Sequence, residues 1–234
     1  PFPTRFTSLT ALQIQYRYRR FKFGTTWVNT WITEHVKEGE RPDDLKKISP
    51  TVSLSWQPWK EQALYLRAMY KNTFRTPTFN DLYYYRMGNR SLRPEKATEY
   101  NIGVTWSANP HPLLEYLTVT ADGYFNRVTD KIVAFPSTYV WKMANYGKAH
   151  ITGLDVTLAT RTVIRKGIAL TLNGNYTWQK AIDLTDPESK NYKDQLPYTP
   201  EHNGSASASL ETPWVTVGYS PVSYTHLRAH ETLS

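Results

Sequence analysis

Apolar and polar side chains alternate along most of this chain, and this alternation constrains the fold more than any other feature of the sequence. A period of two is typical of a β-strand whose two faces meet different surroundings. The clearest segments have their apolar residues at Leu12, Ile14, Tyr16 and Tyr18, at Val52, Leu54 and Trp56, at Tyr100, Ile102, Val104 and Trp106, and at Ile168, Leu170, Leu172, Tyr176 and Trp178. With several weaker segments, the pattern predicts about ten strands.

The links between these strands alternate between short and long in strict order. Short links lie near residue 20 and at 58–62, 108–115, 163–167 and 212–214, and long ones lie at 34–47, 72–97, 136–149 and 183–202. In a meander this order places all long loops at one end of the sheet, which is typical of outer-membrane barrels. We therefore predict an all-β fold, an antiparallel up-and-down meander in which neighbours in sequence pair.

The same pattern predicts which side chains face lipid. On one strand the lipid-facing residues should be Tyr100, Ile102, Val104 and Trp106. Aromatic residues near strand ends are typical of the girdles at the two membrane interfaces. The expected girdle residues are Trp31, Trp56, Trp59, Trp106, Tyr116 and Trp178.

Composition excludes several other classes. With 40% hydrophobic and 14% aromatic residues the chain is too apolar to be disordered, and the absence of cysteine excludes disulfide scaffolds and thiolate zinc sites. No stretch approaches the roughly 18 apolar residues of a membrane-spanning helix. The net charge of +8 is scattered without a long basic run, so we expect no nucleic-acid partner. A soluble β-sandwich explains the alternation equally well, but not long strands in unbroken hairpin order.

The longest link contains an ordered motif. It comprises Phe74, Arg75 and Pro77, then Leu82 and Tyr83, and then Gly88, Asn89, Leu92, Pro94, Glu95 and Lys96. This motif closely resembles that of the TonB-dependent receptors, energised transporters of the Gram-negative cell outer membrane. They commonly carry Phe-Arg-Ala-Pro, Leu-Tyr and Gly-Asn-Pro-x-Leu-x-Pro-Glu-Lys, so this chain departs at Thr76 and Arg90. Further stretches similar to the family are Asn145-Tyr146-Gly147-Lys148-Ala149, Gly153-Leu154-Asp155 and Leu196-Pro197-Tyr198-Thr199-Pro200-Glu201-His202.

The resemblance implies a transmembrane β-barrel of about 22 strands that is filled by an N-terminal plug. Residues 1–220 would form an incomplete part of it, an open curved wall without the plug and with two unpaired edges. The implied function is uptake of a scarce nutrient, an iron–siderophore or a cobalamin-like chelate, with energy from TonB. The implied partners are the TonB complex, acting through the plug, a metal chelate or similar small molecule, and the lipid membrane. A passive porin-like channel and a soluble glycan-binding β-sandwich stay open as alternatives.

Tyrosine and arginine side chains gather in the longest link, and we expect them to contact the ligand. The candidates are Arg75, Tyr83, Tyr84, Tyr85, Arg86 and Arg90. Aromatic and cationic groups on long loops suit flat or anionic ligands, although packing of the loop on the barrel mouth explains them equally well. The interval 78–88 contains no histidine, the usual protein ligand of haem iron, so we expect an iron chelate or a corrinoid rather than haem.

No other motif indicates chemistry. No nucleophile elbow, phosphate loop or dinucleotide fingerprint occurs, so we expect no enzyme activity and no cofactor. We also expect no metal site, because His35, His111, His150 and His202 lack the spacing of a helical metal site. Asp43, Asp44 and Asp81 are most simply solvated turn carboxylates.

The end of the chain, residues 221–234, breaks both the alternation and the resemblance. We expect this segment to be a translated sequencing adapter rather than native sequence. On that interpretation His226 and His230 bind no metal, despite their i, i+4 spacing.

Overall fold

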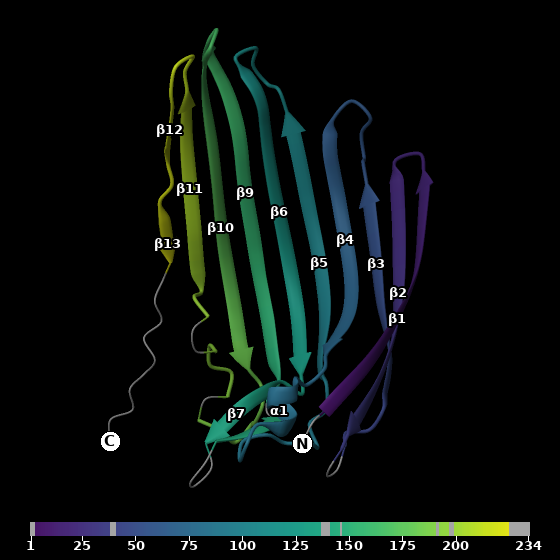
Figure 1. Cartoon of the computed structure of the whole chain (residues 1–234). Helices are drawn as coiled ribbons and strands as arrows, with labels where there is room; N and C mark the ends of the chain where they lie inside the picture. Colours follow the sequence, from purple (N-terminus) through teal and green to yellow (C-terminus); the bar gives the residue numbers. More distant parts are fainter. Residues whose placement is uncertain are drawn as a thin grey trace, which may run out of the picture.

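The computed structural model is an open, curved antiparallel sheet (Figure 1). It describes residues 3–37, 41–136, 141–145, 147–190, 192–196 and 199–224. The elements are β1 Pro3–Tyr18, β2 Phe21–Val36, β3 Leu45–Trp56, β4 Ala63–Arg75, α1 Phe79–Tyr83, β5 Glu95–Ala108, β6 Leu114–Thr129, β7 Ile132–Pro136, β8 Trp141–Asn145, β9 Ala149–Arg165, β10 Ile168–Asp183, β11 His202–Glu211, β12 Thr216–Tyr219 and β13 Val222–Tyr224. None of the helices in the described part is long and apolar enough to cross a membrane.

Strand pairing follows the sequence, as predicted. The sheet runs β1-β2-β3-β4-β5-β6-β9-β10-β11-β12, with every pair antiparallel, and β13 also pairs with β11. The short turns lie at one end of the sheet, and the long loops, with α1 and β7, lie at the other (Figure 1). The all-β meander is therefore confirmed, and the sheet is an open wall rather than a closed barrel.

The two faces of the sheet differ in polarity, as the alternation predicts. One face has a hollow of about 760 Å³, whose lining includes Arg67, Asn101, Asp122 and Asp155, and we call it the inner face. The outer face is apolar, and Ile102 exposes 74% of its surface there. The predicted lipid-facing residues of β5, Tyr100, Ile102, Val104 and Trp106, alternate with inner-face residues along the strand and share the outer face.

Aromatic side chains line the outer face toward both ends of the strands. At the turn end Phe21 stacks on Trp56 with ring centroids 5.6 Å apart. At the loop end Tyr70, Tyr100 and Phe125 form a row across three strands, with centroids 5.3 Å and 6.3 Å apart. Such bands are typical of the interfaces of a membrane barrel.

The girdle prediction is wrong at Tyr116. Tyr116 lies opposite Arg161, on the inner face, because it is an even number of residues from Asp122 and Tyr124 in an unbroken stretch of β6, and both of these line the inner hollow. Trp59 lies in the turn between β3 and β4 rather than on a strand. Trp31, Trp56, Trp106 and Trp178 lie on strands, at outer-face positions by register.

The loop predicted at 136–149 contains unexpected structure. β7 and β8 form a hairpin that makes its own two-stranded sheet, so β6 pairs with β9 across it. Ile132 on β7 is 7% exposed and packs with Leu82 and Leu92, which are 2% and 7% exposed. Burial of these apolar side chains stabilises a hairpin whose own sequence carries only a weak strand signal.

Several other boundaries differ from the expectation. β1 begins at Pro3, well before the first clear alternation at Leu12, because its backbone pairs with β2 along the whole length. Tyr146, Pro197 and Tyr198 of the family-like stretches lie outside the described residues, as does most of the proposed adapter segment, 225–234, with His226 and His230.

Glycines on the inner face let long side chains cross neighbouring strands. The Tyr124 hydroxyl donates to Gln179 Oε1 at 3.1 Å, and a Cβ on Gly153 would lie 2.3 Å from the Tyr124 ring. In the same way the Arg67 guanidinium reaches Asp122 Oδ1 at 2.9 Å across Gly103. These hydrogen bonds connect strands that are not adjacent in the sheet, β6 with β10 and β4 with β6.

Candidate functional site

The candidate site lies at the loop end, where residues 76–94 leave β4 and return to β5. The loop begins with the short helix α1, which Thr78 caps. Thr78 Oγ1 accepts the Asp81 N–H at 3.2 Å and the Thr78 N–H donates to the Asp81 carboxylate at 2.8 Å, a reciprocal capping box. Pro77 is buried, and its carbonyl accepts a hydrogen bond from Arg5 Nη2 at 2.7 Å.

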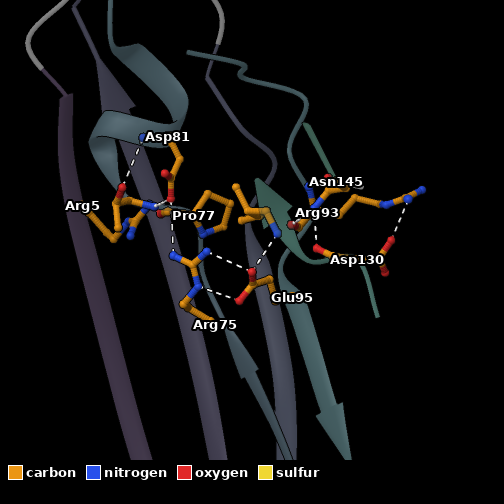
Figure 2. Close-up of polar contacts among 10 residues, drawn as sticks. Arg5, Arg75, Pro77, Asp81, Arg93, Glu95, Asp130 and Asn145 are labelled. Atoms are coloured by element: carbon orange, nitrogen blue, oxygen red, sulfur yellow. Dashed lines mark hydrogen bonds and ion pairs between the residues drawn. The ribbon is translucent and has the colours of Figure 1, made fainter. Parts of the chain in front are cut away.

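Arg75 connects the two halves of the family motif. It donates to both oxygens of Glu95, at 2.7 Å and 3.0 Å, and lies 3.5 Å from Asp81 (Figure 2). Glu95 Oε1 also accepts the backbone N–H of Ile132 at 2.7 Å. A bidentate arginine–carboxylate pair fixes orientation as well as distance, so Arg75 holds the start of the loop, its end and β7 together.

Tyr83 is tied to the first two strands rather than free for a ligand. Its hydroxyl donates to Glu34 Oε2 at 3.2 Å, and Glu34 is 5% exposed. Arg5 Nε donates to the other Glu34 oxygen at 2.7 Å, and the Arg5 guanidinium lies 4.9 Å from the Phe79 ring centroid. Burial and the neighbouring Glu34 carboxylate raise the pKa of the Tyr83 phenol, so Tyr83 stays a neutral donor.

The turn that follows α1 presents the exposed members of the predicted set. Tyr84 and Tyr85 expose 59% and 79% of their surfaces. The Arg86 guanidinium stacks over the Tyr85 ring, with its carbon 5.2 Å from the ring centroid. The Arg90 guanidinium stacks over the Tyr83 ring, with its carbon 5.6 Å from the ring centroid, and Arg90 is only partly exposed. The structure thus separates Tyr84, Tyr85 and Arg86, which face solvent, from Arg75 and Tyr83, which hold the loop.

The second half of the motif packs the loop against the β7–β8 hairpin. Asn89 Nδ2 donates to the Met143 carbonyl at 3.0 Å. Asn145 Oδ1 accepts the Arg93 N–H at 2.6 Å, and Asn145 Nδ2 donates to the Arg93 carbonyl at 2.7 Å. Arg93 in turn pairs with Asp130 at 2.7 Å (Figure 2). A Cβ on Gly88 would lie 2.6 Å from the Leu82 carbonyl, so glycine is required for this close backbone approach.

A small cavity lies beside this loop. It measures about 270 Å³, and its lining includes Glu34, Asp43, Asp44, Arg90 and Arg93. This volume is at the lower limit of typical small-molecule sites, too small to enclose a large chelate by itself. Among the described residues, no three histidine or acidic side chains come together as metal ligands.

Sequence reasoning missed Arg5 and Glu34. The signal that could have found them is the strand register, because Arg5 lies directly opposite Glu34 in the β1–β2 ladder. Opposite charges at one cross-strand position on the inner face indicate a pair.

The chain matches a family model described as "TonB dependent receptor-like, beta-barrel" over residues 5–230. A vitamin B12 transporter BtuB of Photobacterium profundum is 31% identical over 94 residues, which are 38% of this chain and 14% of that protein. The match therefore spans about one seventh of the length of that relative.

Two solved structures have the same fold. The FrpB iron transporter of Neisseria meningitidis superposes with a TM-score of 0.65 at 15% identity, over 93% of this chain and 32% of that chain. The siderophore receptor PiuA of Acinetobacter baumannii does so with a TM-score of 0.65 at 14% identity, over 94% of this chain and 33% of that chain. At this identity the likeness shows the fold alone.

Proposed function

Because the chain belongs to the TonB-dependent receptor β-barrel family of the Gram-negative outer membrane, we propose that it forms wall and loop segments of an uptake receptor. The ligand is a corrinoid or a ferric siderophore, and the energy comes from TonB. The resemblance in sequence to a vitamin B12 transporter supports the corrinoid. The fold shared with FrpB and PiuA is compatible with an iron chelate.

The exposed turn that follows α1 is the observation that carries this proposal. The loop is held at both ends by Arg75–Glu95 and at its centre by Tyr83–Glu34, while Tyr84, Tyr85 and Arg86 remain exposed. Holding the backbone rigid reduces the entropy that is lost when exposed side chains order on a ligand. Tyrosine offers a stacking face and arginine a planar set of donors, which suit a large, partly anionic chelate.

The contacts of Tyr83 support a ligand other than haem. A tyrosine binds haem iron as a phenolate, and Tyr83 is a neutral donor to Glu34 with a raised pKa. Deprotonation next to the Glu34 carboxylate would place two negative charges side by side.

Binding by the full-length receptor tests the proposal. We expect cyanocobalamin or a ferric siderophore to bind tightly, and Tyr85→Ala with Arg86→Ala to weaken binding about tenfold or more, because each group loses a direct contact. The matched control is Trp214→Ala, an exposed aromatic residue at the turn end, 92% exposed, which should leave binding unchanged. Equal binding by both variants would contradict the site.

Uptake in cells tests the energy source. Transport of the bound chelate should be lost when TonB is deleted, whereas surface binding should remain. TonB-independent uptake that rises linearly with concentration would instead identify a passive channel.

A further inference from the structure

Basic residues gather at the loop end, at the level of the aromatic row on the outer face and just beyond it. On β6 Arg127 follows Phe125 by two residues, and on β10 Lys180 follows Trp178 by two residues, so each cation shares a face with its aromatic neighbour. Arg127 lies opposite His150 of β9 in the ladder. We call Arg127, Lys148, His150 and Lys180 the basic cluster.

Register places the members of the cluster near one another. Thr152 of β9 is the cross-strand partner of both Phe125 and Lys180, one step along the outer face from His150. Lys148 precedes His150 by two residues and lies immediately before β9 begins at Ala149. Because adjacent strands are about 4.8 Å apart, the members on β6, β9 and β10, namely Arg127, His150 and Lys180, extend about 10 Å across the sheet.

The positive charge of the cluster is not neutralised within the described part of the chain. No ion pair among the described residues includes Arg127, Lys148 or Lys180. Arg127 and Lys180 are exposed, and His150 Nε2 is buried without a hydrogen-bond partner in the structure. Lys96 on β5 differs, because it lies 3.7 Å from Asp130.

The position of the basic cluster relative to the membrane interface indicates which molecules it contacts. The aromatic row marks the level of the membrane interface. Arg127 lies two residues, about 7 Å, beyond Phe125, which is headgroup level. Lys180 lies at the level of the row, and its long side chain can extend to the same headgroups. Phosphate is the main anionic group of lipid headgroups, and arginine and lysine both bind it strongly. A span of about 10 Å suits a headgroup with two phosphates better than a single phosphate ion.

We propose that Arg127, Lys148, His150 and Lys180 form a lipid-binding site on the outer wall for a phosphorylated lipid headgroup of the leaflet on the loop side. The guanidinium group of Arg127 and the ammonium groups of Lys148 and Lys180 bind the phosphates. The acyl chains lie along the apolar surface that contains Phe125. The site is separate from the loop that is proposed to bind the transported chelate.

Titration of the full-length receptor in detergent, followed by native mass spectrometry, tests this site. The probes are bis-phosphorylated lipid A, its dephosphorylated form and inorganic phosphate. We expect the triple variant Arg127→Gln, Lys148→Gln, Lys180→Gln to bind lipid A about 10- to 100-fold more weakly. The matched control is Lys60→Gln, Arg165→Gln, Lys166→Gln, which removes the same charge from exposed positions at the turn end and should bind within about twofold of the parent.

Four outcomes would overturn the proposal. They are unchanged lipid A binding in the triple variant, equal loss in the control, equal binding of the dephosphorylated lipid, and inorganic phosphate that binds as tightly as lipid A. Heat-modified mobility on gels checks that each variant is folded. If the triple variant does not fold, the single variant Lys180→Gln decides, because we expect it to bind about three- to tenfold more weakly and an unchanged affinity would contradict the site.

Discussion

Arg75 and Glu95 are the last cross-strand pair of the β4–β5 ladder, and the Arg75 guanidinium donates to both carboxylate oxygens, at 2.7 Å and 3.0 Å. The pair closes residues 76–94 into a loop with a fixed base. Both residues belong to the family motif, and their contact with each other gives the motif a structural role.

Removing one partner of this pair should loosen the loop. In the full-length receptor, Arg75→Gln should lower the stability of the loop base by about 1 kcal/mol, a discounted value because Arg75 is 47% exposed. Hydrogen exchange of residues 76–94 measures the effect. Lys71→Gln is the matched control, because Lys71 and Glu99 are also a cross-strand pair but lie 3.7 Å apart, and it should change exchange much less. Equal exchange in the two variants would show that the bidentate contact does not hold the loop.

Tyr83→Phe should loosen the contact of α1 with β2. The variant removes one donor from the buried Glu34 carboxylate, at a cost of about 1 kcal/mol. Limited proteolysis at 79–90 should become faster. Tyr84→Phe removes the hydroxyl of an exposed neighbour and should leave the cleavage rate unchanged. Slow cleavage in both variants would refute the anchoring role of Tyr83.

Haem should bind weakly, if at all, to the full-length receptor. Tyr83 is occupied by Glu34, and the loop interval 78–88 offers no histidine. Absorbance titration in the Soret region measures the affinity. A nanomolar haem affinity that is abolished by Tyr83→Phe or Tyr84→Phe would show that our ligand prediction is wrong.

Val104→Lys should prevent assembly of the full-length protein. Val104 lies on the outer face between Ile102 and Trp106, and a lysine near the bilayer midplane costs about 2–4 kcal/mol. The control is Thr105→Lys, whose side chain points to the polar inner face, where Thr105 contacts Thr120. Surface abundance, measured by whole-cell labelling, should fall strongly for the first variant and less for the second. Normal abundance of Val104→Lys would contradict the lipid-facing assignment.

Gly153→Val should weaken the wall, because a Cβ at this position would lie 2.3 Å from the Tyr124 ring and 2.8 Å from the Trp178 carbonyl. Overpacking of this kind costs about 1–3 kcal/mol. Gly174→Ala is the control, since the nearest atom to its Cβ would be the Ser205 carbonyl at 4.0 Å. The temperature at which half of the protein shifts from the folded to the unfolded gel mobility should drop for Gly153→Val alone. An equal drop in both variants would mean that loss of glycine, rather than the Tyr124 contact, is responsible.

The sequence by itself determined the long strands of the main sheet, their order and, at most positions, the polarity of their faces. These features depend on local periodicity, because side chains alternate along a strand and hairpin partners are neighbours in the chain. The outer-face position of Tyr100 and Ile102 followed from that rule, and the motif from Phe74 to Lys96 was sufficient to identify the family.

Only the tertiary structure decided which side chains of the long loop are free. Tyr83, Tyr84 and Tyr85 are equivalent by composition, yet Tyr83 binds Glu34, which is 49 positions away in sequence, while the other two face solvent. The β7–β8 hairpin was missed for a related reason. It is stabilised by burial of Ile132 against Leu82 and Leu92, and such contacts depend on where the loop folds back, which local periodicity does not encode.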